Sequence, residues 1–185
     1  ENPYEQGRKR STQKSRTQRT TDLHVEHVVP RCRRPELAEE WTNFLLACSN
    51  CNGIKQNRNH SRDGYIWPDS DDTQAAFEYL PDGIVKVQHD LPAPERARAT
   101  RLYELVGLGR TPTADPRARD MRWLKRRAAW RQAEEARQKL EDGADVVGCV
   151  IRLAVAIGFW SVWITVFAGH PQVRDLLRQH FPGSR

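Results

Sequence analysis

The sequence predicts an α+β protein with its strands in the first half and its helices in the second. A β-branched run from Asp22 ends at Pro30, and a second apolar stretch near residues 76–87 is split by a Pro-Asp-Gly turn. From residue 95 onward the apolar residues recur with helical spacing. The 185 residues suffice for one sizeable core or two small ones. We expect a small strand-and-helix unit, a short β-hairpin extension and a C-terminal helical bundle.

The first strand carries the residues with the clearest chemistry. Glu26 and His27 are adjacent on it, so their side chains point to opposite faces unless the strand ends or twists there. An imidazole with an ordinary pKa near ~6.5 can take a proton from water, so His27 is the candidate general base. The segment from Cys48 to Lys55 indicates a turn that enters a helix.

Together, the Glu-His pair, Asn43 in the following loop and the Cys-x-x-Cys-Asn-x-x-Lys segment resemble the HNH nucleases. The resemblance implies a ββα-metal finger over residues 21–60, in which two strands and a helix hold one divalent cation against a scissile phosphate. It implies that Glu26 and Asn52 bind the cation, that Asn52 also belongs to the catalytic motif, and that Asn43 orients the base. Carboxylate and amide oxygens suit Mg²⁺ or Mn²⁺.

Two cations of this segment are candidates for phosphate binding. Lys55 lies three residues after Asn52, on the same helical face, and Arg58 is assigned the same role. A solvated helix residue is the alternative for Lys55. Magnesium-assisted hydrolysis needs such positive groups to hold the backbone in line.

The cysteines depart from the pattern of many HNH proteins, which carry two Cys-x-x-Cys pairs for a structural zinc. Here Cys48 and Cys51 form the only such pair, and a site completed by Cys32 and His24 follows no spacing rule. Structural zinc at Cys48 and Cys51 therefore stays open as an alternative. Four cysteines and no signal-like apolar start favour a reducing, cytoplasmic setting.

The charge balance favours a polyanionic partner, because the formal net charge is +6 and the pI is near 9.4. Residues 1–20 form a basic, polar arm that cannot bury apolar surface by itself. It either contacts nucleic acid or only solubilises the chain, and we favour contact because it leads into the first strand. Its cationic residues are Arg8, Lys9, Arg10, Lys14, Arg16 and Arg19.

Residues 61–94 predict a β-containing extension. Tyr65-Ile66-Trp67 indicates a short strand stopped by Pro68, and the acids that follow indicate a solvated turn. Residues 76–87 indicate a hairpin.

The sequence pattern of residues 95–185 predicts a helical domain that docks on a partner. Helices are expected over Glu95–Val106, from Asp115 to about Asp142, and over Gln172–His180. The segment from Val146 to Ala168 has the length of a membrane span, but Arg152 and several small polar residues interrupt it, so we expect a buried helix and no membrane. With Trp123 and Trp130 it offers apolar surface for a partner.

The segments Gly64–Asp69 and Gly158–Trp163, with the finger motifs, resemble the small HNH proteins of Septu-type and retron-associated anti-phage systems, the PtuB-like subunits. The resemblance implies an effector nuclease in a larger hetero-oligomer with an SMC-like or ABC-like ATPase. We favour DNA over RNA as its substrate, and RNA stays open as an alternative. Two alternatives stay open. One is a stand-alone, restriction-like HNH enzyme, and the other is a non-catalytic zinc-knuckle module that binds nucleic acid or protein.

Overall fold

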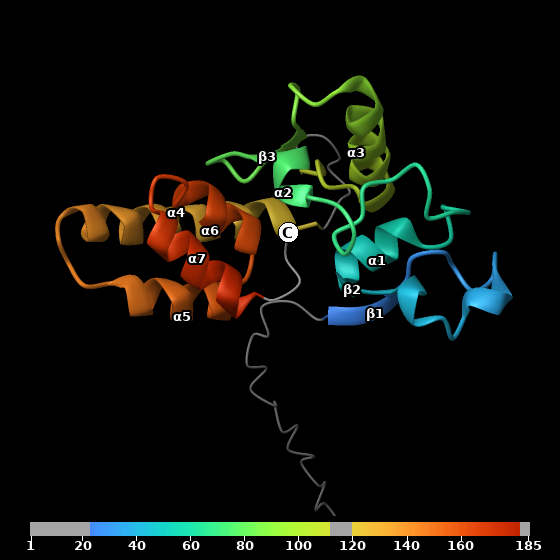
Figure 1. The fold of residues 1–185 in the computed structure, drawn as a ribbon, viewed down its shortest axis with the longest axis horizontal. Coiled ribbons are helices and arrows are strands. Elements are labelled where there is room, and N and C mark those ends of the chain that lie inside the picture. The colour runs from blue at the N-terminus through green and yellow to red at the C-terminus, as the bar shows by residue number, and fades with distance from the viewer. Residues whose placement is uncertain (1–22, 112–119, 182–185) are drawn as a thin grey trace, which may run out of the picture.

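The computed structural model describes residues 23–111 and 120–181. The basic arm at residues 1–20 and the segment around Asp115 and Pro116 lie outside this range. Strands occupy the first part of the described chain and helices the rest (Figure 1), which is compatible with the α+β prediction.

The described part of the chain starts at residue 23 with an antiparallel hairpin, which a short helix follows. Strand β1 (Leu23–His27) pairs with β2 (Phe44–Cys48), and α1 (Ser49–Lys55) follows at once. Between the strands lie two 3₁₀ turns, η1 (Pro35–Leu37) and η2 (Trp41–Asn43). The Cys48 thiol accepts a bond from the Cys51 backbone N–H and so caps α1. We call the unit from β1 to α1 the finger.

A second hairpin and a helix complete the first half. Helix α2 (Thr73–Ala76) leads into β3 (Phe77–Tyr79), which pairs with β4 (Val85–Val87) as the Pro-Asp-Gly turn predicts, and α3 (Ala93–Val106) follows. Gly83 in the turn has φ +85°, and a Cβ there would lie 2.0 Å from the Trp123 carbonyl oxygen. Glycine at this position therefore lets the turn pack against the later helix.

The predicted strand at Tyr65–Trp67 is wrong. This segment is an irregular loop whose Ile66 and Trp67 side chains are buried. The Asp71 carboxylate accepts the backbone N–H of Trp67, and the Arg98 guanidinium donates to the Tyr65 carbonyl. Side chains thus satisfy backbone groups that a neighbouring strand would otherwise bind.

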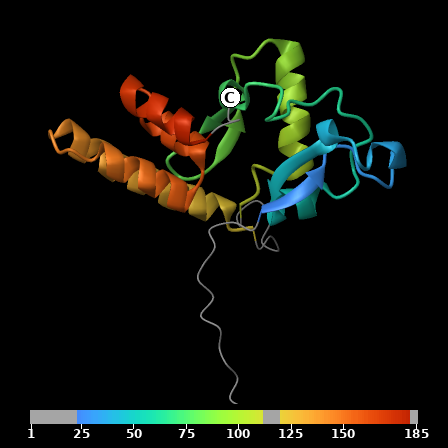
Figure 2. The same ribbon diagram turned by 60° about the horizontal axis from the view of Figure 1, so that its bottom comes forward.

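Within residues 120–181 the structure has four helices, α4 (Arg122–Glu141), α5 (Val147–Ile157), α6 (Trp160–Val166) and α7 (Pro171–His180). The charged helix expected from Asp115 begins only at Arg122 within the described chain. Its N-terminal end lies beside the first half and its other end points away from it (Figures 1 and 2).

The single apolar helix expected over residues 146–168 is divided into α5 and α6. Gly158 and Phe159 both have positive φ angles, of 77° and 58°, and the Trp163 indole N–H binds the Gly158 carbonyl at 3.0 Å. The chain therefore reverses at Gly158. No helix among the described residues is long and apolar enough to cross a membrane.

The fold has two apolar cores. The first core lies between the finger, the loop at Ile66 and Trp67, the second hairpin and α3, and includes Val28, Phe77 and Leu102. The second core lies among α4–α7, with Trp163 and Phe167 fully buried. Helix α3 thus packs with the finger half, so the predicted boundary at residue 95 does not follow the packing.

Much of the apolar surface that we expected to be available for a partner is covered. Val150, Trp163 and Phe167 are buried in the second core, and both Trp123 and Trp130 are half-buried. Val155 and Leu124 stay exposed, by 55% and 39%.

Candidate functional site

The candidate general base lies at the end of β1, where regular pairing stops. The His27 ring packs against the Phe44 ring, with centroids 4.9 Å apart, and its Nε2 lies 3.0 Å from the Ala38 carbonyl oxygen. A carbonyl can only accept a hydrogen bond, so Nε2 carries the proton. In the neutral imidazole Nδ1 is then the nitrogen that can accept a proton from water.

Asn43 holds the loop that presents the Ala38 carbonyl. It is 5% exposed, and its amide oxygen accepts the Val29 N–H at 2.8 Å. Its amide nitrogen donates to the carbonyls of Val29 and Leu37, each at 3.0 Å. Leu37 immediately precedes Ala38, so these bonds fix the backbone that orients the imidazole. Sequence reasoning assigned Asn43 this organising role but gave no sign that Ala38 is the acceptor.

Glu26 lies on the other face of the hairpin from His27. Its carboxylate forms an ion pair with Lys55, at 2.5 Å between Oε1 and Nζ. The side chains of Lys55 and Glu26 are only 3% and 14% exposed, and Lys55 also donates to the His27 carbonyl at 2.8 Å. Glu26 and His27 are adjacent on β1, and both are paired with β2. Because successive side chains of a strand point to opposite faces of the sheet, the two side chains lie on opposite faces of the hairpin.

This arrangement changes the role of Lys55. The predicted phosphate contact needs an exposed ammonium, whereas Lys55 is buried and binds Glu26 and a backbone carbonyl of the first strand. Arg58 is exposed, but its guanidinium donates to the Glu104 and Leu105 carbonyls at the end of α3. Both cations therefore connect α1 to its surroundings, and the structure does not support the predicted phosphate contacts.

The two predicted metal ligands share one cavity. Glu26 and Asn52 both line a cavity of about 240 Å³ between the finger and the first core, with Leu45, Trp67 and Phe77 among its walls. One carboxylate and one amide are few ligands, which fits a hard cation that keeps most of its waters. Lys55 already binds one carboxylate oxygen, which leaves few oxygen donors for a cation, and among the described residues no group of three or more His, Cys, Asp or Glu side chains is placed to hold a metal.

The cysteine pair lies beside a different cavity, of about 510 Å³, at the junction of the finger with α4 and α6. The Arg122 guanidinium donates to the Cys51 sulfur at 2.9 Å, and a salt bridge to Asp120 holds Arg122 in place. The hydrogen bond from Cys51 lowers the pKa of Cys48 to about 5, against the opposing effect of burial, and Arg122 adds to this shift. The same hydrogen bond and burial raise the pKa of Cys51.

These contacts do not fit a structural zinc. Within residues 23–111 and 120–181 there is no group of three or more His, Cys, Asp or Glu side chains placed to hold a metal, and Cys32 and His24 are both exposed. A guanidinium against the Cys51 sulfur also places a positive charge where a cation would bind. Nothing in the sequence near the cysteines indicated that Arg122, far along the chain, would be their partner.

Asn59 is a further structural residue that sequence reasoning missed. It is 1% exposed and its amide donates to the Val28 carbonyl at 2.6 Å, directly after the strand that carries His27. The finger is therefore held by polar side chains on both sides of the candidate base.

Comparison with known proteins agrees with the reading of the finger. Residues 11–58 match the family model described as HNH endonuclease. The match includes Glu26, His27, Asn43 and Asn52, and it suggests a nuclease that acts on nucleic acid. No curated protein shows a significant match to the chain.

Proposed function

We propose, on the premise that residues 11–58 carry an HNH domain, that this protein is a metal-dependent endonuclease that hydrolyses phosphodiester bonds, with DNA as the preferred substrate. The observation that carries the proposal is the orientation of His27. Its Nε2 is fixed as a donor to the Ala38 carbonyl, so Nδ1 is left to accept a proton from the attacking water.

In this proposal each residue of the finger has one task. His27 takes the proton from water, and Asn43 keeps the imidazole in place through the loop at Leu37 and Ala38. Glu26 and Asn52 would hold the Mg²⁺ or Mn²⁺ on the opposite face of the hairpin from His27, so this proposal requires the scissile phosphate to bind at the end of β1, where it can reach both faces. When bound, the cation supplies Lewis-acid stabilisation of charge on the phosphate and the leaving oxygen.

Lys55 and Arg58 have supporting tasks. Lys55 holds the Glu26 carboxylate in place on the inner face of the hairpin through their ion pair. Arg58 joins the finger to α3. The phosphate contacts come instead from the basic arm at residues 1–20, which lies outside the described residues and which we keep as a proposal on charge alone.

The direct test is cleavage by the His27→Ala variant with His24→Ala as the matched control. Both imidazoles belong to β1, but His24 is exposed at its start. We expect His27→Ala to lower the cleavage rate by about 10²–10⁴-fold in Mg²⁺ or Mn²⁺, the contribution of a general base, and His24→Ala to cut at the wild-type rate.

A second arm of the same experiment addresses the metal. Glu26→Gln and Asn52→Ala should raise the Mg²⁺ concentration needed for half-maximal cleavage, and EDTA should abolish it. If the His27→Ala variant cleaves at the wild-type rate, or if the wild-type protein is fully active in excess EDTA, the proposed chemistry is wrong. Stoichiometric zinc without any cleavage would favour the zinc-knuckle alternative.

We further propose, on the resemblance to PtuB-like subunits, that the nuclease works as an effector of an anti-phage complex with an SMC-like or ABC-like ATPase. Val155 on α5 and Leu124 on α4 are among the exposed apolar residues of the helical half, and they support a contact there. Co-expression with an ATPase encoded by an adjacent gene should give a complex. The double variant Leu124→Asp/Val155→Asp should weaken this complex. A monomer that ignores the ATPase and cuts specific sites would favour the stand-alone restriction enzyme.

A further inference from the structure

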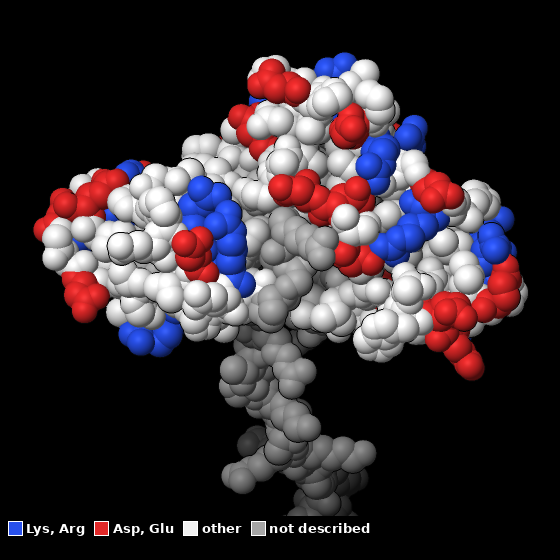
Figure 3. All heavy atoms as spheres, viewed as in Figure 1, with Lys and Arg blue, Asp and Glu red and all other residues white. Residues whose placement is uncertain are grey.

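The outer face of the β1–β2 hairpin is apolar and open to solvent. Leu23, Val25 and Leu46 are 62%, 65% and 69% exposed, and Trp41, just before β2, is 85% exposed. The strand register pairs Val25 with Leu46, so these side chains lie on one face. Uncharged surface over β1 is visible in Figure 3. We call Leu23, Val25, Trp41 and Leu46 the apolar strip.

The strip ends at the candidate base. The next residue pair on this face of the hairpin is His27 with Phe44. The Trp41 indole meets the Phe44 ring edge-on, with centroids 6.2 Å apart, and Phe44 packs against His27 at 4.9 Å. A row of three aromatic rings therefore runs from the imidazole to an indole that has one side in water.

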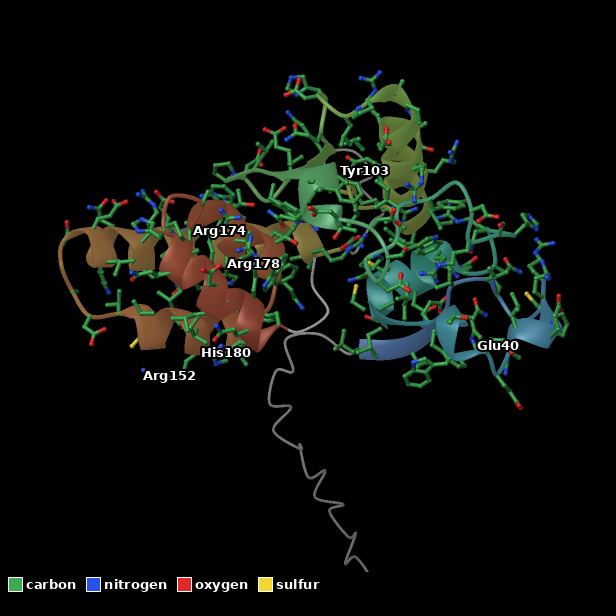
Figure 4. All side chains as sticks on the ribbon, in the orientation of Figure 1. Glu40, Tyr103, Arg152, Arg174, Arg178 and His180 are labelled. Carbon is green, nitrogen blue, oxygen red and sulfur yellow. The ribbon has the colours of Figure 1, made fainter. Side chains whose placement is uncertain are left out.

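Charge determines which part of a nucleic acid this surface can accept. Glu39 and Glu40 precede Trp41 and are both exposed, and Glu40 lies at the outer end of the finger (Figure 4). These two carboxylates are the charges next to Trp41 in the chain, and they repel a phosphate at the indole itself, whereas the flat face of a base carries no net charge. Arg31 and Arg33, earlier in the same loop and also exposed, carry positive charge. Stacking on an indole is also tolerant of base identity, because every base has a π-face.

We propose that Trp41 stacks on an unpaired nucleobase next to the scissile phosphate, and that single-stranded or locally unwound nucleic acid is therefore the preferred substrate. The inference rests on the proposed function and names its substrate class. A base inside a duplex is already stacked on both sides, so only an unpaired or extruded base can reach the indole. Val25 and Leu46 extend the contact toward the neighbouring nucleotide.

The binding test compares Trp41→Ala with Met121→Ala, which removes an exposed apolar side chain from the other half of the molecule. Anisotropy of a fluorescein-labelled single-stranded 12-mer and of its duplex is measured in EDTA, so that no cutting occurs. We expect Trp41→Ala to raise Kd for the single strand about tenfold, Trp41→Phe to raise it less, and Met121→Ala to leave it unchanged. The Kd for the duplex should stay the same in all variants.

The salt dependence of binding and the molecular mass of the free protein separate the remaining outcomes. Trp41→Ala should not change the slope of log Kd against log salt, since stacking neutralises no phosphate. An equal loss on single strand and duplex would overturn the inference, as would an unchanged Kd. A wild-type protein that is a dimer, with a Trp41→Ala variant that is a monomer, would also overturn the inference, because the apolar strip would then bind a second copy of the chain.

Failure of this inference and failure of the nuclease proposal give different results. If cleavage depends on His27 but Trp41→Ala affects the single strand and the duplex equally, the nuclease proposal stands and the stacking role of Trp41 is wrong. If single-strand binding depends on Trp41 but no cleavage depends on His27, the surface binds nucleic acid and the nuclease proposal is wrong.

Discussion

The two cores of the molecule differ in what they bury. The first core shares its interior with Asn43, Lys55 and Asn59, each bonded to backbone groups near His27. In the second core, from Ala133 onward, no described polar or charged residue is buried. Apolar packing tolerates many exchanges of similar volume, whereas a buried polar group must meet its own partner. The difference suggests that the first core is built to fix a geometry and the second to provide stability.

The largest effect on stability should come from the second core. Phe167 is fully buried, and Phe167→Ala should lower the free energy of unfolding by about 3–5 kcal/mol, because it removes apolar contacts and leaves a cavity. Urea unfolding measures this loss. Cleavage per folded molecule should be unchanged, and a specific loss of activity in the folded protein would contradict the division of tasks between the cores.

A loss of similar or slightly smaller size is expected for Lys55→Met in the first core. The substitution leaves the Glu26 carboxylate buried without its partner, which costs roughly 3–5 kcal/mol for a fully buried pair and less here, because Glu26 keeps some exposure. Lys55→Met combined with Glu26→Gln should recover part of the stability. If Lys55→Met is as stable as wild type and only weakens binding of nucleic acid, Lys55 is a phosphate ligand after all.

The smallest change in stability, with a disproportionate change in activity, is expected for Asn43→Ala. It leaves the Val29 N–H and two carbonyls without their side-chain partner, at about 1–3 kcal/mol. Cleavage should fall further than the folded fraction does, since the loop that orients His27 is released. Thermal unfolding and cleavage rates on the same sample separate the two effects. Activity that falls only in step with stability would reduce Asn43 to a structural residue.

The sequence by itself determined the residues of the finger and much of the local structure. Glu26, His27, Asn43 and Asn52 could be proposed as site residues because their types and order follow a motif whose spacing is local in the chain, and all four lie within the stretch that matches the HNH family model. The hairpin at Phe77–Val87 followed from alternation and its Pro-Asp-Gly turn, and α3 from a helical pattern that ends at glycine. Each of these signals acts over a few residues, so no tertiary contact is needed to interpret it.

Only the tertiary structure decided the partners of those residues. The Ala38 carbonyl on His27, the Glu26–Lys55 pair and the Arg122 contact with Cys51 join segments 11, 29 and 71 residues apart. The loop at Tyr65–Trp67 and the reversal at Gly158 were also decided by packing, since side chains and a second core satisfied groups that the local pattern left open. Long-range contacts select among the structures that local sequence allows, and a single pattern carries no information on which distant residue will be the partner.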